Sequence, residues 1–244
     1  MCSALAALSG RRRGKCPSFS VVAAGRGETQ LRLWSPEKAV SAGDRFLCWV
    51  KYSRGILVCD MADTNNLMIR HLPLPVMPRE GRRNHGSYSD DADDDYQMKH
   101  CRNMCGAGTD ALRFVSIDPR CCCGGPGRGV CARSAFAFTV TTWTMCLGTG
   151  EETVWVKDSV LDCEELWALP GYEGLPRVPP VCPVVSSDNP DIVCFKVSNR
   201  RLVSSSYDQQ KVWILEVNTR RKVMLSVFQC PNDPYDHLPA KFTN

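Results

Sequence analysis

The chain has 244 residues, of which 43% are hydrophobic and 23% are charged. These values are ordinary for globular proteins and exclude a wholly disordered or collagen-like chain. Lys and Arg number 30 against 26 Asp and Glu, and the net charge of +4 is too small to indicate nucleic-acid binding. The sequence contains no apolar run long enough for a membrane-spanning helix. At about 150 residues per domain, the length allows one or two domains.

The N-terminal part of the chain is basic. Residues 1–27 contain five basic residues and no acidic one, and they are rich in Ala, Ser and Gly. The apolar stretch at residues 4–8 is too short for a secretory signal, and it precedes the arginines rather than following them. We interpret residues 1–28 as a basic flexible segment, with an organellar transit peptide as the alternative.

The 15 cysteines are an odd number, so a complete disulfide scheme would leave one thiol over. Cys48, Cys59 and Cys194 lie in apolar runs, where a reduced thiol behaves as a small hydrophobic side chain. Together with the absence of a secretory signal, this favours an intracellular protein of the cytoplasm or nucleus.

Strand patterns begin at residues 46–51 and 55–60, two apolar runs that are separated by the turn 52–54. They predict a β-hairpin. In the first run Phe46, Cys48 and Val50 share one face, while Leu47 and Trp49 share the other. Because both faces are apolar, we expect this strand to lie between two neighbouring layers.

Residues 111–118 repeat the pattern of two apolar faces, and residues 134–145 begin with apolar residues at even positions and continue with them at odd positions. The change of parity at Thr141 and Thr142 indicates a β-bulge. We further predict strands at 154–156, 192–197, 212–217 and 223–228, the last two joined by the hairpin loop 218–221.

One segment has a helical pattern. Asp162 and Glu165 have the spacing of a capping box, and Pro170 and Gly171 end the helix. Short strands separated by turns, with one short helix, predict a mainly β, antiparallel fold over residues 29–230. Most of the tryptophans lie in these strand-like runs. A large aromatic residue in each hairpin is common in propeller blades, so this favours a propeller-like arrangement. Residues 231–244 form a C-terminal tail.

Two stretches interrupt this β-domain. In residues 79–108 three arginines, Arg79, Arg82 and Arg83, precede the acidic run 90–95, and residues 119–133 contain the sequence CCCGGPGRG. Such composition buries too little apolar area to offset chain entropy, so we expect both stretches to be disordered insertions.

Six short motifs occur in the order found in a plant protein family. They are 46–50 (FLCWV) with 55–60 (GILVCD), 71–75 (HLPLP), 112–115 (LRFV), 141–144 (TTWT) and 189–195 (NPDIVCF). On these residues the chain resembles the grass-expanded domain of unknown function 1618 family, from about residue 31 to 228. The resemblance implies a propeller-like β-fold with no assigned activity and no catalytic residues. Longer members have more sequence before the first motif, so we expect an incomplete set of blades.

Catalytic motifs are missing from the sequence: it has no zincin motif, nucleophile elbow, P-loop or C-x-x-C pair. The candidate metal ligands are His100, Cys101 and Cys105, to which the loop cysteines Cys121, Cys122, Cys123 and Cys131 could be added. Cys101 and Cys105 have a spacing that zinc sites use, but the second group lacks a paired spacing. We therefore assign no catalytic, cofactor-binding or metal-binding residue, and we predict no small-molecule substrate.

The function that these observations favour is a non-catalytic protein-interaction scaffold with a protein partner and no membrane contact. An enzyme with an unrecognised site and a zinc-binding Cys-rich module are the alternatives. For the partner surface we favour Tyr172 and Arg177 in the segment 167–178 over the acidic run 90–95, because Trp, Tyr and Arg dominate binding hot spots. We expect Trp49, Trp143, Trp155 and Trp213 to lie in the core.

Overall fold

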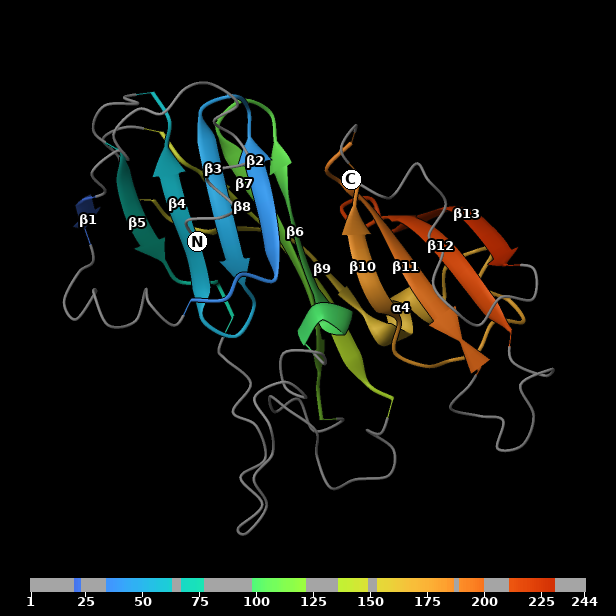
Figure 1. Cartoon of the computed structure of the whole chain (residues 1–244). Coiled ribbons are helices and arrows are strands. Elements are labelled where there is room, and N and C mark those ends of the chain that lie inside the picture. The colour runs from blue at the N-terminus through green and yellow to red at the C-terminus, as the bar shows by residue number, and fades with distance from the viewer. Residues whose placement is uncertain are drawn as a thin grey trace, which may run out of the picture.

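The structure is a computed structural model that describes residues 20–22, 34–62, 67–76, 98–121, 136–148, 153–186, 189–199 and 211–230. Three β-sheets lie side by side in chain order (Figure 1). All strand pairs except one are antiparallel among the described residues, so the prediction of a mainly β, antiparallel fold is confirmed. The C-terminal tail, residues 1–19 and the greater part of both predicted insertions lie outside the described residues.

The first sheet has five strands in the order β1-β5-β4-β3-β2. Its strands are β1 (Ser20–Val22), β2 (Lys38–Ala42), β3 (Phe46–Lys51), β4 (Gly55–Asp60) and β5 (Met68–Leu72). β3 and β4 form the predicted hairpin, while β1 pairs in parallel with β5. Because β1 lies within residues 1–28, the prediction of a wholly flexible N-terminal segment is wrong for these three residues.

The second and third sheets each have four strands, joined in chain order. The second consists of β6 (Arg102–Ala107), β7 (Ala111–Pro119), β8 (Phe138–Cys146) and β9 (Val156–Asp162). The third consists of β10 (Val181–Val185), β11 (Ile192–Ser198), β12 (Val212–Asn218) and β13 (Val223–Cys230). Leaving β1 aside, each of the three sheets is an antiparallel meander of four consecutive strands.

The second sheet lies between two hydrophobic cores, and this explains its two apolar faces. Val115 and Ile117 of β7 pack into the core shared with the third sheet, whereas Leu112 and Phe114 pack into the core shared with the first. β8 follows the same division, with Phe138 and Val140 on one side and Trp143 and Met145 on the other. The predicted irregularity in β8 is present: its register with β9 shifts between Thr142 and Trp143.

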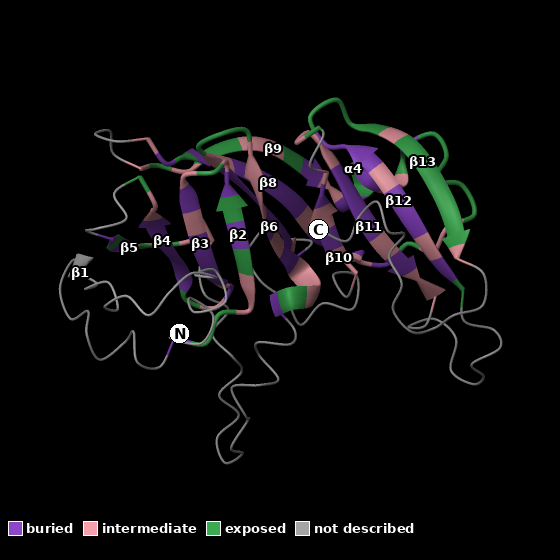
Figure 2. Cartoon of the chain, turned by 45° about the horizontal axis from the view of Figure 1, so that its top comes forward, coloured by how far each residue is buried: buried purple, intermediate pink, exposed green. Residues whose placement is uncertain are grey.

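β3 also has two buried faces, as its sequence predicts. Phe46, Cys48 and Val50 pack into the core between the first and second sheets, and Trp49 and Leu47 pack into a smaller cluster on the other face. Figure 2 shows the resulting distribution, in which the central strands β3, β4 and β8 are largely buried and β13, the outermost strand of the third sheet, is largely exposed.

The first strands of the meanders bring the sheets together. β2 packs against β6, and β10 packs against β6 and β7. The close approach of β2 and β6 requires glycine at position 106, since a Cβ there would collide with the backbone carbonyl of Ser41.

The helix α4 (Cys163–Trp167) has the predicted capping box. The Asp162 side chain accepts a hydrogen bond from the backbone N–H of Glu164, and the Glu165 carboxylate accepts one from the N–H of Asp162. A second helical turn at residues 98–101 was not predicted. It places Met98 in the core between the first and second sheets.

The predicted insertions are therefore shorter than expected. Residues 98–108 contain a helical turn and β6, and residues 119–121 continue from β7, so these parts of 79–108 and 119–133 are ordered. The reason is tertiary: β6 has few apolar residues, but it pairs with β7 along its whole length and buries Met104 completely.

Candidate functional site

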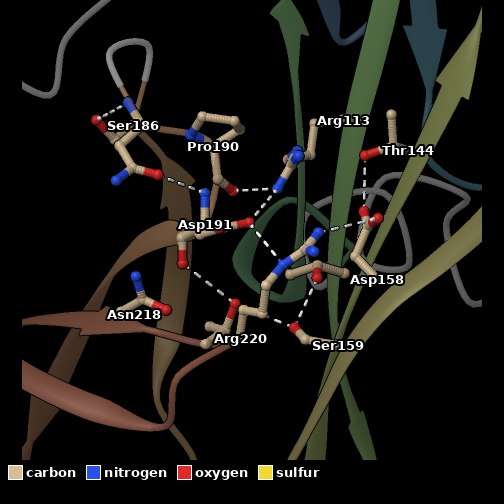
Figure 3. Close-up of polar contacts among 12 residues, drawn as sticks. Arg113, Thr144, Asp158, Ser159, Ser186, Pro190, Asp191, Asn218 and Arg220 are labelled. Carbon is tan, nitrogen blue, oxygen red and sulfur yellow. Dashed lines mark hydrogen bonds and ion pairs between the residues drawn. The ribbon is translucent and has the colours of Figure 1, made fainter.

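A network of polar side chains joins the second sheet to the third (Figure 3). At its centre is Asp191, which lies in the turn before β11. The turn is set by Asn189, whose side-chain oxygen accepts a hydrogen bond from the N–H of Asp191 over 3.0 Å. This is the local geometry for which an Asn-Pro-Asp sequence is suited.

Arg113 reaches this turn from the middle of β7. Its Nη1 donates to the backbone carbonyl of Pro190 over 2.5 Å and to the Asp191 carboxylate over 3.2 Å. The Arg113 side chain is only 9% exposed. A buried guanidinium requires such partners, because an unpaired charge is costly in the interior.

Arg220 approaches Asp191 from the hairpin between β12 and β13. Its Nε donates to the same carboxylate oxygen over 3.2 Å, and its Nη2 lies 3.7 Å from the carboxylate of Asp158 on β9. Thr144 of β8 also donates to Asp158, over 2.7 Å. The two carboxylates are therefore held by two arginines, and the charges of these four side chains balance.

A chain of hydroxyl groups runs beside these ion pairs. The hydroxyl oxygens of Thr142 and Ser159 lie 2.7 Å apart and share a hydrogen bond, and the Ser159 hydroxyl donates to the Thr219 hydroxyl over 3.0 Å. The backbone N–H of Thr219 donates to the carbonyl of Asp191 over 2.9 Å. Nε of Arg113 has no hydrogen-bond partner among the described residues, but the other groups named here bind one another. The chemistry of the network is that of a clamp between two sheets.

Three of the sequence motifs meet at this clamp: 112–115 supplies Arg113, 141–144 supplies Thr142 and Thr144, and 189–195 supplies Asp191. The sequence identified the motifs but not their meeting point. The available signal was an arginine between two apolar residues, Leu112 and Phe114, of a predicted strand, because a buried arginine needs an acceptor from another element.

The candidate metal ligands are spread over several elements. His100 and Cys101 lie in the helical turn before β6, Cys105 lies on β6, and Cys121 follows β7. Among the residues that the structure describes, no three His, Cys, Asp or Glu side chains are placed to hold a metal ion. Cys122, Cys123 and Cys131 lie outside the described residues.

The prediction that Tyr172 belongs to a partner surface is wrong. Tyr172 is 2% exposed and lies in the core between the second and third sheets. Its hydroxyl donates to the carbonyl of Pro176 over 3.0 Å, and burial raises the pKa of the phenol to about 12. The turns at Gly171 and Gly174 fold this segment back on itself. As a result the Tyr172 ring packs in the core and is not available to a partner. Arg177 is exposed, and residues 90–95 lie outside the described residues.

The tryptophans divide into two groups. Trp49 and Trp143 are buried, as predicted. Trp213 is only partly buried against the core between the second and third sheets. Trp155 precedes β9 rather than lying on a strand, and its indole N–H donates to the carbonyl of Pro73. The prediction that these four tryptophans lie in the core is therefore correct for Trp49 and Trp143, and it is wrong in part for Trp155 and Trp213.

The outermost strand of the third sheet, β13, has exposed apolar side chains on both of its faces. Val227 lies opposite Leu215, and Phe228 lies opposite Ile214, which is on the other face of β12. Val227 is 39% exposed and Phe228 54%. Val223 and Leu225 are exposed as well. Among the described strands, only β12 pairs with β13, so its outer edge carries backbone groups that a further strand could pair with.

The family model described as "Protein of unknown function (DUF1618)" matches residues 49–194. The chain belongs to the DUF1618 family. The DUF1618 match starts in β3 and ends in β11, so it includes Arg113, Asp158 and Asp191 of the clamp. Searches of curated proteins and of solved structures found no match. In the described part of this DUF1618 chain, no helix is long and apolar enough to cross a membrane.

Proposed function

We propose that this DUF1618 protein is a non-catalytic scaffold that binds another protein at the edge of β13, and that its three sheets are blades of an incomplete propeller. Propeller blades are four-stranded antiparallel sheets that follow one another along the chain. The three meanders have this organisation, and β2, β6 and β10 lie next to one another as the strands nearest a propeller axis would.

The cores support the same arrangement. Adjacent blades pack face to face, and here one core lies between the first and second sheets and another between the second and third. The clamp around Asp191 adds a polar connection to the second of these interfaces. A rigid scaffold of this kind presents its edges and loops for recognition.

The observation that carries the proposal is the apolar edge of β13, on which no further strand lies in the described part of the chain. Long exposed edge strands are normally protected by charges, prolines or a covering element, because they pair readily with other chains. β13 spans eight residues and has no charged residue. By contrast, β9, the outer edge strand of the second sheet, is engaged by the 219–222 hairpin through Asp158 and Ser159.

The occupant that we propose is an extended segment of a partner protein, added as a fifth strand beside β13. Its backbone would pair with the open edge, and its alternating apolar side chains would cover Val227 on one face and Phe228 on the other. Arg220 and Lys222 are already paired with carboxylates of the chain, but Arg221 is exposed just before β13. It favours an acidic residue at the end of the partner segment that lies beside it.

A peptide selection tests this proposal. Short random peptides displayed on phage are selected on the purified chain, and the enriched sequences are measured by fluorescence anisotropy. We expect alternating apolar sequences with a flanking acidic residue. The variant Leu225→Lys with Val227→Lys should weaken their binding by about tenfold or more, because charge on the edge opposes strand addition.

The matched control is Val156→Lys, which places the same charge at an exposed valine on β9. It should leave binding unchanged. Equal binding by the β13 variant and the wild type would overturn the proposal. So would a wild-type dimer in sedimentation that the β13 variant abolishes, because the edge would then be occupied by a second copy of the chain.

We further propose that the scaffold works in a compartment that keeps thiols reduced. Cys48 and Cys194 are completely buried, and burial raises the pKa of the Cys48 thiol to about 12. Such thiols serve as small apolar core residues.

A further inference from the structure

Cys182 has an unusual backbone conformation at the start of β10. Its φ is +52°, in the left-handed region that residues other than glycine adopt rarely. The register between β10 and β11 shifts at this point, between Val181 and Val184. Irregularities of this kind commonly turn a side chain away from the position that regular pairing would give it.

The Cys182 side chain contacts a histidine from the helical turn that precedes the second sheet. Its Sγ lies 3.3 Å from Nδ1 of His100, although the two residues are 82 positions apart. His100 is part of the helical turn at residues 98–101, and the strand that follows, β6, packs against β10. Figures 1 and 2 both place this turn next to the start of β10.

A histidine at this distance can change the reactivity of a thiol. The thiolate is the nucleophilic form of cysteine, and an adjacent imidazole that accepts the thiol proton favours it. Both Cys182 and His100 are partly exposed, so a small reagent can reach the sulfur. Buried cysteines such as Cys48 lack this access.

We propose that Cys182 and His100 form a thiolate–imidazolium pair and that Cys182 is the thiol through which this chain reacts with hydroperoxides and other soft electrophiles. With a hydroperoxide, the thiolate sulfur attacks the terminal oxygen, an S–O bond forms and the O–O bond breaks. The sulfur is oxidised to a sulfenic acid, and the proton of the imidazolium goes to the departing oxygen, which leaves as an alcohol or water.

The first test measures alkylation of the folded chain by iodoacetamide at pH 6.5, residue by residue, with mass spectrometry. In this reaction an S–C bond forms and iodide leaves. Cys146 is the internal control, because it is a free, exposed cysteine at the end of β8. A thiol whose pKa is lower by about two units has about a hundredfold more thiolate, but each thiolate is about tenfold less nucleophilic. We therefore expect Cys182 to react about tenfold faster than Cys146, although Cys146 is more exposed.

The variant His100→Gln distinguishes the effect of the adjacent imidazole on the reactivity of Cys182 from the effect of solvent exposure. It should slow alkylation of Cys182 by about tenfold and leave Cys146 unchanged. Thermal unfolding of the variant verifies that the sheets remain assembled. If the variant does not fold, the comparison of Cys182 with Cys146 in the wild type decides alone.

The second test treats the chain with hydrogen peroxide and traps sulfenic acid with dimedone. Labelling should appear first at Cys182 and should disappear there in Cys182→Ser. The proposal is overturned if Cys146 is alkylated or oxidised before Cys182, or if a folded His100→Gln variant reacts at Cys182 as fast as the wild type.

Discussion

The guanidinium of Arg102 crosses from the second sheet to the first and donates a hydrogen bond to the backbone carbonyl of Tyr52, over 2.6 Å. Arg102 is 1% exposed. The backbone N–H of Tyr52 donates to the carboxylate of Glu37 over 2.6 Å, so the turn after β3 is held on both sides by charged groups. Burial raises the pKa of the Tyr52 phenol, which therefore stays neutral beside them.

Arg102→Ala should lower the free energy of unfolding by about 2–4 kcal/mol, because it removes a charged hydrogen bond and leaves a cavity. Arg102→Met fills most of the same volume without a charge, and it should cost less. Urea denaturation measures both. An alanine variant as stable as the wild type, or a methionine variant less stable than the alanine variant, would contradict this role for Arg102.

Gly106→Ala should destabilise the chain by about 1–3 kcal/mol, because the added methyl group forces β6 away from β2. Gly148→Ala is the matched control, since a Cβ at Gly148 meets open space. It should change the free energy of unfolding by less than about 0.5 kcal/mol. Equal effects of the two substitutions would mean that the first two sheets do not approach each other as closely as described.

The two groups of tryptophans should differ in their contribution to stability. Trp143→Ala removes a buried side chain that contacts Phe114 at 5.5 Å between ring centroids, and it should cost about 3–5 kcal/mol. Trp213→Ala should cost about half as much, since part of that side chain remains in water. Chemical denaturation of both variants provides the comparison, and a larger loss for Trp213→Ala is the result that conflicts with it.

The cap of α4 should make stability depend on pH. Burial by itself would raise the pKa of Asp162, but hydrogen bonds from Arg120 and from the N–H of Glu164 outweigh it and lower the pKa below its ordinary value of 3.8. A carboxylate with a lowered pKa stabilises the fold above pH 4, and this contribution is lost as the pH falls through the folded-state pKa.

Asp162→Ala should therefore cost about 1–2 kcal/mol at pH 7, and the difference from the wild type should shrink below about pH 4. Glu164→Gln, an exposed change in the same helical turn, is the control and should have little effect. Unfolding curves from pH 3 to pH 7 measure the difference. A gap between Asp162→Ala and the wild type that stays constant with pH would contradict the assigned partners of Asp162.

The clamp between the second and third sheets should depend on Asp191 more than on Arg220. Asp191→Asn leaves the buried Arg113 without its counter-charge and should cost about 1–3 kcal/mol. Arg220→Gln should cost at most about 1 kcal/mol, because that side chain is 55% exposed. A double-mutant cycle between Arg113 and Asp191 measures their coupling directly, and zero coupling would show that the ion pair does not hold the sheets together.

The sequence alone determined the local structure of this protein. Alternation of apolar residues in β3, β7 and β8 predicted strands with two buried faces, and each face packs into a different cluster. The spacing of Asp162 and Glu165 predicted the capping box. These predictions succeeded because a strand face or a helix cap depends on residues within a few positions of each other.

The tertiary structure decided everything that depends on which faces meet. β6 has too few apolar residues to be predicted as a strand, and it forms because β7, β2 and β10 surround it. Tyr172 has the composition of a binding surface around it, yet the turns at Gly171 and Gly174 direct it into the core.

The clamp and the Cys182–His100 pair likewise depend on contacts that local sequence patterns do not predict. Arg113 meets Asp191 across 78 positions, and His100 meets Cys182 across 82. A single sequence contains no local signal for such distances, because the free energy that brings these residues together comes from burying the two faces of the second sheet between its neighbours. The polar side chains are carried to their partners by that apolar packing.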